Sequence, residues 1–215
     1  MNIFDLNVER YDSWFNIHNI IYKNELKMLS SFIKEDLYGI EIGVGTGRFA
    51  SELGTRIGID ISLNMLRIAR RRGVEVIYAN GEKMPFKDPL FDYVSMIVTI
   101  CFLEDPYKVL RESHRVLSDG GRVYIAFIER NSKYGIYYHK NRQVSPFYVR
   151  ANFYTVQEIE DMLKKTGFMI EGYAQTLFHE PGVEIEEEWE YGYDRGSFVL
   201  VIGEKSGDHK DLKTH

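Results

Sequence analysis

The sequence has few of the features that mark secreted, membrane-spanning or metal-cluster proteins. Its 215 residues include a single cysteine, Cys101, which excludes an intramolecular disulfide and a cysteine-rich metal cluster. No apolar run approaches the roughly 18 residues of a membrane helix, so no membrane span is expected. The N-terminus lacks a basic start followed by an apolar run, so it is not a signal peptide. These absences favour a reducing, cytoplasmic setting.

Positive charge is also scarce. The formal net charge is −5 and the chain has no long basic stripe, so nucleic acid is not an expected partner. Residues 1–205 suffice for one domain with a substantial core, whereas the polar residues 206–215 predict a disordered tail. The expected partner is a small-molecule substrate, and nothing in the sequence indicates an oligomeric state.

The most informative stretch is a glycine-rich turn. Short apolar residues lead into an acid, Glu41, and then into glycines at every second position: Gly43, Gly45 and Gly47. This pattern is typical of a strand that enters a tight turn and leaves as a helix. Glycine is needed where φ is positive or where a ligand approaches closely. The start of the helix adds free N–H groups and a positive dipole end, so the turn is predicted to bind a polar ligand.

Two kinds of ligand fit such a turn. The dinucleotide fingerprint G-x-G-x-x-G/A requires a third small residue where this chain has Arg48. A pyrophosphate would also gain nothing from Glu41. A carboxylate at that position suits a ligand that carries an ammonium or sulfonium charge. A purely structural glycine turn is the remaining alternative.

A second acid follows at the end of the next predicted strand, residues 56–60. Asp60 lies 19 residues after Glu41, at the strand end where open α/β sheets bind ligands. A carboxylate there can accept hydrogen bonds from both hydroxyls of a ribose, and Ile61 can lie flat on an adenine. Ser62 can cap the following helix, which leaves Asp60 available to a ligand.

The pattern Glu-x-Gly-x-Gly-x-Gly at residues 41–47 resembles motif I of the class I S-adenosylmethionine-dependent methyltransferases. Residues 11–15, 80–86 and 110–121 resemble, in the right order, segments of the type 11 and ubiquinone/menaquinone-biosynthesis-like members. The resemblance covers residues 11–205. It implies transfer of a methyl group from S-adenosylmethionine to a small-molecule acceptor, with S-adenosylhomocysteine as product. A non-catalytic S-adenosylmethionine-binding regulatory module is the alternative, and an NAD(P)-dependent oxidoreductase is disfavoured by Arg48.

The resemblance implies a set of cofactor-binding residues and no metal. They are Tyr11, Trp14, Glu41, Gly43, Gly45, Gly47, Asp60, Ile61, Met65, Asn80, Gly81, Glu82 and Thr99. Family members commonly have an aspartate where this chain has Asn80, and that aspartate accepts from the adenine amino group. An amide oxygen can accept the same bond without a charge. No catalytic residue is assigned, because an acceptor that is already deprotonated needs no base.

The acceptor side is less well marked. Residues 129–154 carry five basic and seven aromatic residues, which favours a substrate lid over a solvated helix. Its candidate substrate residues are Tyr134, Tyr137, Tyr138 and Tyr148. The seven acids of residues 180–196 form either a solvated loop or an attraction for a cationic substrate. Cys101 is interpreted as a buried thiol, because a carbon-5 pyrimidine methyltransferase would need a Pro-Cys pair and Ile100 precedes it.

Alternating strands and helices predict an α/β fold with a doubly wound, mostly parallel sheet. The resemblance makes this a Rossmann-like sheet of seven strands in the order 3-2-1-4-5-7-6, with an antiparallel last strand. The expected domain is residues 1–205, with an N-terminal helical cap at 1–35 and the lid at 129–154.

Overall fold

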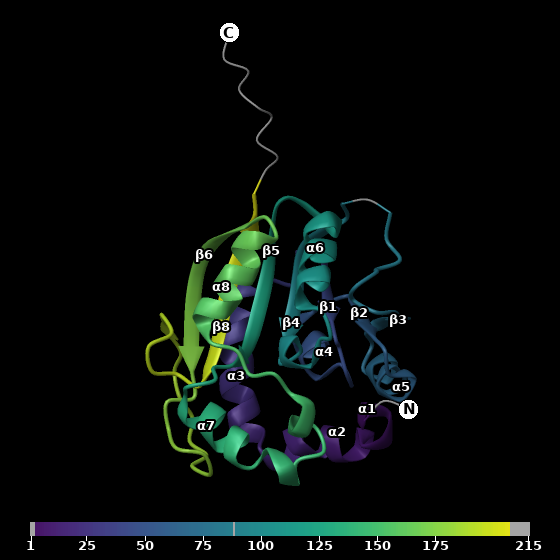
Figure 1. The fold of residues 1–215 in the computed structure, drawn as a ribbon. Coiled ribbons are helices and arrows are strands. Elements are labelled where there is room, and N and C mark those ends of the chain that lie inside the picture. The colour runs from purple at the N-terminus through teal and green to yellow at the C-terminus, as the bar shows by residue number, and fades with distance from the viewer. Residues whose placement is uncertain (1–2, 88, 207–215) are drawn as a thin grey trace.

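The computed structural model describes residues 3–87 and 89–206, which form one mixed sheet with helices on both faces (Figure 1). The sheet has the strand order β3-β2-β1-β4-β5-β8-β6-β7 within these residues. The strands are β1 (Gly39–Ile42), β2 (Ile57–Asp60), β3 (Glu75–Tyr78), β4 (Phe91–Ile97), β5 (Leu117–Ile128), β6 (Phe168–Thr176), β7 (Glu190–Tyr191) and β8 (Phe198–Lys205).

The predicted strand order is confirmed. Strands β3, β2, β1, β4 and β5 are parallel, and β8 inserts antiparallel between β5 and β6. The two-residue strand β7 was not predicted, and it extends the edge beyond β6. Strand β5 begins at Leu117, and its pairing with β4 shifts register between Leu117 and Arg122, where Gly120 has φ of 72°. All but Ser206 of the predicted disordered tail lies outside the described residues.

The helices fall into three groups. Those that connect strands are α4 (Arg48–Leu53), α5 (Leu63–Arg71), α6 (Pro106–Val116) and α8 (Val156–Lys165); those before the sheet are α1 (Ile3–Leu6), α2 (Val8–Ile17) and α3 (Asn19–Phe32). After β5 comes α7 (Lys133–Lys140), and short 3-10 turns form η1 (Ile100–Phe102), η2 (Arg142–Val144) and η3 (Tyr148–Arg150). No helix in the described part of the chain is long and apolar enough to cross a membrane.

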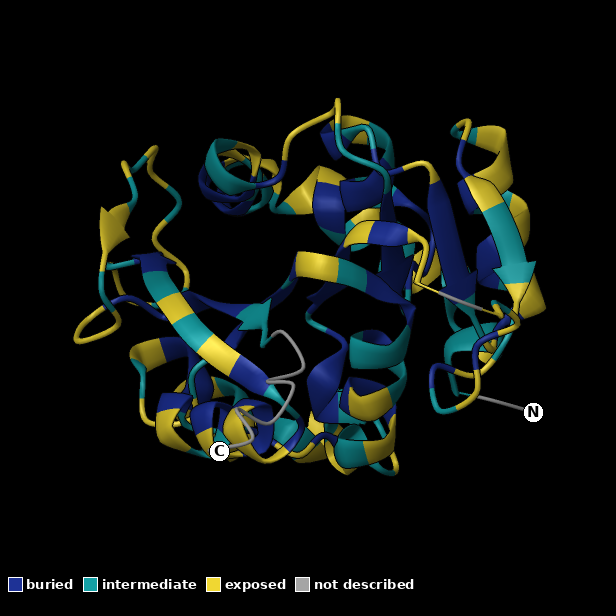
Figure 2. Ribbon diagram, turned by 90° about the horizontal axis from the view of Figure 1, so that it is seen from above, coloured by how far each residue is buried: buried dark blue, intermediate teal, exposed yellow. Residues whose placement is uncertain are grey.

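The core lies on both faces of the sheet because its central strands are apolar on both sides. In β5, Val123 and Ile125 pack with α6 and α8 on one face. Tyr124 and Ala126 pack with α3, α4 and α7 on the other. Figure 2 shows the buried residues concentrated along the central strands and the exposed ones on the outer helix surfaces.

The segment that the sequence predicted to be helical before the sheet contains three helices. The helices break at Asn7 and His18. No glycine or proline occurs before Gly39 to mark these breaks. Figure 1 shows α1, α2 and α7 at the end of the sheet where β5 finishes. Helices α1 and α2, which precede β1, and helix α7, which follows β5, therefore meet at the edge where α/β sheets bind ligands.

Candidate functional site

The glycine turn between β1 and α4 has the left-handed backbone that its sequence predicts. Gly43, Gly45 and Gly47 have φ of 70°, 53° and 76°. A Cβ on Gly43 would lie 2.4 Å from the Thr99 side chain, so this glycine permits close packing against the end of β4. A Cβ on Gly45 would instead lie 3.2 Å from the Tyr11 hydroxyl. Helix α2 therefore lies directly over the turn.

Asp60, at the end of β2, fixes the shape of this turn. Its Oδ2 accepts from the backbone N–H of Gly45 at 2.9 Å, and its Oδ1 accepts from the N–H of Ser62 at 2.8 Å. Burial raises the pKa of Asp60, and these backbone hydrogen bonds oppose the rise. A carboxylate oxygen can accept a second bond, so Asp60 can also receive the two hydroxyls of a ribose.

Glu41 is a buried carboxylate with an unsatisfied oxygen. Its exposed fraction is 2 %, and Oε2 has no hydrogen-bond partner among residues 3–87 and 89–206. Burial, and then the nearby charge of Asp60, raises the pKa of Glu41 well above its usual value. Because buried polar atoms are normally paired, this orphaned oxygen indicates a place for a ligand with a donor group or positive charge.

An ion-pair cluster holds α2 against the glycine turn. The Asp12 carboxylate accepts from Arg48 Nη2 at 2.9 Å, Arg72 Nη2 at 2.8 Å and Thr46 Oγ1 at 2.7 Å. Burial would raise the pKa of Asp12, but the hydrogen bonds from both guanidinium groups hold it well below its usual range. The N-terminal segment is thus attached at Asp12, next to Tyr11, which covers the turn.

The predicted adenine-side residues come together along the ends of β2 to β4. Ile61 is 51 % exposed beside Asp60, so an apolar face is available there. The Asn80 Oδ1 already accepts from the N–H of Glu82 at 2.9 Å, which leaves one lone pair for an adenine amino group. Glu82 forms an ion pair with Lys108 at 3.5 Å.

The other predicted cofactor residues have packing roles in the structure. Thr99 Oγ1 donates within the turn region, to the carbonyl of Gly43 at 3.3 Å or of Ile97 at 3.1 Å. Met65 is buried in α5, and a Cβ on Gly81 would lie 2.8 Å from the Ile42 side chain. Trp14 packs its ring on Phe15 and His18 in the N-terminal segment, at 5.3 and 5.0 Å.

Three of the four predicted substrate tyrosines form a cluster. Tyr134 is buried, and the rings of Tyr138 and Tyr148 lie 4.7 Å apart, although they come from α7 and η3. The Tyr134 and Tyr138 rings are 5.9 Å apart. The Tyr137 ring lies 5.7 Å from that of Tyr138, but Tyr137 is 48 % exposed. It is therefore at the surface and not part of the buried cluster.

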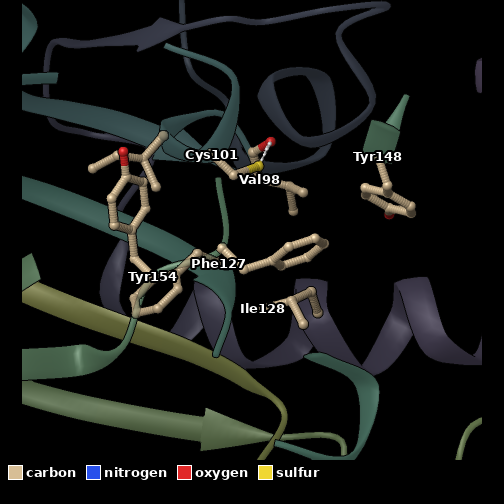
Figure 3. Close-up of a pocket in the computed structure, with 8 residues that line it drawn as sticks. Val98, Cys101, Phe127, Ile128, Tyr148 and Tyr154 are labelled. Atoms are coloured by element: carbon tan, nitrogen blue, oxygen red, sulfur yellow. Dashed lines mark hydrogen bonds between the residues drawn. The ribbon is translucent and has the colours of Figure 1, made fainter. Parts of the chain in front are cut away.

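A small apolar cavity lies beside Tyr148 at the ends of β4 and β5 (Figure 3). Its lining includes Cys101, whose Sγ lies 3.7 Å from the Val98 carbonyl oxygen. Burial raises the pKa of Cys101 to about 12, so the thiol stays protonated and the interpretation as a buried thiol holds. Val98 has φ of 51°, an unfavourable conformation for a β-branched residue. Such strain often marks functional sites.

The sequence analysis missed Glu25, a buried acid on α3. Its exposed fraction is 4 %, and it lies among the buried residues Ile21, Met28 and Leu29 on one face of the helix. The helical spacing of the apolar residues could have revealed it. Glu25 stands at position i+4 of a stripe that Ile21 begins and Met28 continues at i+7, where an apolar residue is expected.

Comparisons with known proteins agree with this geometry. Residues 40–125 match the family described as Methyltransferase domain. An uncharacterized protein of Methanocaldococcus jannaschii is 43 % identical over 205 residues, covering 95 % of this chain and 100 % of the relative. Phosphoethanolamine N-methyltransferase 2 of Caenorhabditis elegans is 31 % identical, covering 75 % of this chain and 40 % of the relative.

A crystal structure of a protein from Thermotoga maritima has a similar fold and sequence. It is described as an S-adenosylmethionine-dependent methyltransferase and possible histamine N-methyltransferase. It is 40 % identical to this chain, with a TM-score of 0.91, and the match covers 95 % of this chain and 99 % of that one. The chain belongs to the S-adenosylmethionine-dependent methyltransferases, as the motifs at residues 41–47 and beyond indicated.

Proposed function

We propose that the protein binds S-adenosylmethionine at the glycine turn and transfers its methyl group to a small-molecule acceptor. The observation that carries the proposal is the orphaned Glu41 oxygen near Asp60, at a turn whose glycines let Thr99 and Tyr11 pack closely around it. When bound, the cofactor supplies an electrophilic methyl group on a sulfonium sulfur. Asp60 would hold its ribose, and Glu41 would face a positively charged or hydrogen-bond-donating part.

The chain's own contribution is alignment and exclusion of water. Well-oriented reactants can recover about 7–11 kcal/mol of a barrier. Tyr11, held over the turn through Asp12, closes one side of the site. We assign the acceptor to the aromatic cluster of Tyr134, Tyr138 and Tyr148, because an enzyme needs an acceptor site and a non-catalytic binding module does not. Two relatives have names that give nitrogen as the methylated atom, which supports a nitrogen acceptor.

Isothermal titration calorimetry tests the cofactor assignment. S-adenosylmethionine and S-adenosylhomocysteine are expected to bind with a stoichiometry of one. NAD is expected to give no heat of binding, because Arg48 stands where its pyrophosphate turn needs a small residue and its guanidinium pairs with Asp12. Binding of NAD alone would contradict the proposal.

We also propose that residues 129–154 act as a lid over the acceptor. In limited digestion with trypsin, S-adenosylhomocysteine together with an acceptor is expected to slow cleavage after Lys133, Lys140 and Arg142. Cleavage after Lys164 and Lys165, exposed at the end of α8, should not change and serves as the internal control. Mass spectrometry measures the fragments. Equal rates at all five bonds with and without ligands would show that the segment does not close.

A further inference from the structure

Helix α3 places an acid where its sequence pattern calls for an apolar residue. Glu25 is as buried as its neighbours Ile21 and Leu29. Within residues 3–87 and 89–206 its carboxylate has no hydrogen-bond or ion-pair partner. Burial raises its pKa to about 8. A buried carboxyl group without a hydrogen-bond partner is costly, so its presence in a natural protein indicates a ligand that pairs with it.

The surroundings of Glu25 are aromatic and come from three separate elements. They are Tyr11 of α2, Tyr134 and Tyr138 of α7, and Tyr148 of η3. Burial is the main cause of the raised pKa of each of these phenols, and the charge of Glu25 contributes to all four. Ile21, Met28 and Leu29, which flank Glu25 on the buried face of α3, belong to the same core cluster as Tyr134, and Tyr11, Tyr138 and Tyr148 pack against that cluster. The face of α3 that carries Glu25 is therefore turned toward these tyrosines. A carboxylate among aromatic faces is the combination of groups that recognises an organic ammonium ion.

Tyr11 links the aromatic surroundings of Glu25 to the proposed cofactor site. Its hydroxyl lies near Gly45, within the glycine turn. Burial and the charges of Glu41 and, more weakly, Glu25 raise its pKa. Tyr11 therefore reaches the glycine turn with its hydroxyl and packs against the core cluster that α3 shares with Tyr134, Tyr138 and Tyr148. A group bound at Glu25 would lie next to the turn that holds the methyl donor.

The acidic segment after β6 is attached to α3 next to Glu25. Asn24, next to Glu25, donates to the carbonyl of Ile185 at 2.8 Å and accepts from the N–H of Glu187 at 3.1 Å. These bonds attach residues 185–187 to α3. After burial, the charges of Glu187, Glu25 and Glu184 raise the pKa of Tyr134 to about 12. Within the segment, Glu184 pairs with His18 at 2.6 Å and Glu187 pairs with His179, so both acids already have partners, unlike Glu25.

From this arrangement we infer that Glu25 and the surrounding tyrosines bind the amino group of the methyl acceptor, so that the substrate is a primary or secondary amine. The inference rests on the proposed methyl transfer. Glu25 would pair with the ammonium form and then take one proton from it, which frees the nitrogen lone pair. A base that titrates near neutral pH is suited to that transfer.

The transfer balances without a further reactant. The neutral amine nitrogen attacks the methyl carbon, a nitrogen–carbon bond forms, and the sulfur–carbon bond breaks with its electron pair passing to sulfur. The products are S-adenosylhomocysteine and the N-methylated ammonium ion. Glu25, now a carboxylic acid, returns its proton to solvent.

Calorimetry with matched amine and alcohol probes tests the inference. The protein is saturated with S-adenosylhomocysteine at pH 8.5 and titrated with 2-phenylethylamine, 3-phenylpropylamine or butylamine, and with the corresponding alcohols. We expect at least one amine to bind, and Glu25→Gln to weaken it by at least about tenfold, the scale of removing one partner of a buried charge pair. Alcohol binding should not depend on the substitution. Glu35→Gln, at an exposed glutamate that follows α3, is the matched control.

The outcomes are distinct. If S-adenosylhomocysteine itself does not bind, the proposed function fails. If it binds but no amine does, or if Glu25→Gln binds amines as tightly as the wild type, only the amine inference is overturned. As a second readout, mass spectrometry after incubation with S-adenosylmethionine should show a methylated amine and no methylated alcohol. A methylated alcohol with an unmodified amine would also overturn it.

Discussion

The Glu25→Gln variant is expected to melt about 10 °C above the wild type at pH 9, and at nearly the same temperature at pH 5, without ligands. Burial raises the pKa of Glu25 from 4.5 to about 8 in the folded state, so the folded protein holds this proton more tightly than the unfolded chain. That stability is fully present below about pH 4.5 and is lost as the pH rises through about 8. The pKa difference corresponds to about 5 kcal/mol, and glutamine avoids the loss.

Thermal unfolding by circular dichroism across pH 5–9 measures this difference. The tyrosines that face Glu25 from α2, α7 and η3 have raised pKa values, so they stay neutral in this range. Glu41 also has a raised pKa, but both proteins share it. Glu35→Gln should follow the wild-type curve. If Glu25→Gln is less stable than the wild type at pH 9, the carboxylate has a structural partner and is not an unpaired group in a binding site.

Asp60→Ala is expected to weaken binding of S-adenosylhomocysteine by roughly ten- to hundredfold, or about 1.5–3 kcal/mol. The substitution removes the acceptor proposed for the ribose hydroxyls. It also frees the N–H groups of Gly45 and Ser62, which Asp60 holds at 2.9 and 2.8 Å. Asp60→Asn should lose less, because its amide oxygen can keep one of these bonds and still accept from a hydroxyl.

Calorimetry measures the affinities, and circular dichroism confirms that each variant is folded. Asp119→Ala, at an exposed aspartate near the opposite end of β5, is the matched control and should bind like the wild type. An Asp60→Ala protein that is folded and binds within twofold of the wild type would show that Asp60 only shapes the turn.

The glycine turn and the cap of the next helix could be predicted because their information is local. The three glycines follow Glu41 within six residues, and Ser62 accepts from the N–H of Met65 as the predicted cap of α5. The capping box of Thr155 and Glu158 at the start of α8 is an equally local pattern. Such short-range patterns, repeated along alternating strands and helices, predict a doubly wound sheet, and the resemblance to a known family then gives the order of its strands.

The features that the sequence analysis missed depend on distant partners. Asp12 is one of several charged residues on an amphipathic helix, and only the fold brings it to Arg48 and Arg72. Glu25 breaks an apolar stripe, but nothing near it in sequence shows that tyrosines more than a hundred residues away surround it. Strand β7 has two residues, too few for an alternating pattern to be recognised.

The proposed acceptor pocket also has a consequence for how such proteins diverge. The match to the methyltransferase family spans residues 40–125, which include Glu41 and Asp60. Glu25 precedes that range, and Tyr138 and Tyr148 follow it. Mutations on α3 and α7 can therefore alter the choice of acceptor while the inherited donor chemistry is retained. Exchanging the segments that flank residues 40–125 between two relatives is accordingly a direct route to exchanging their substrates.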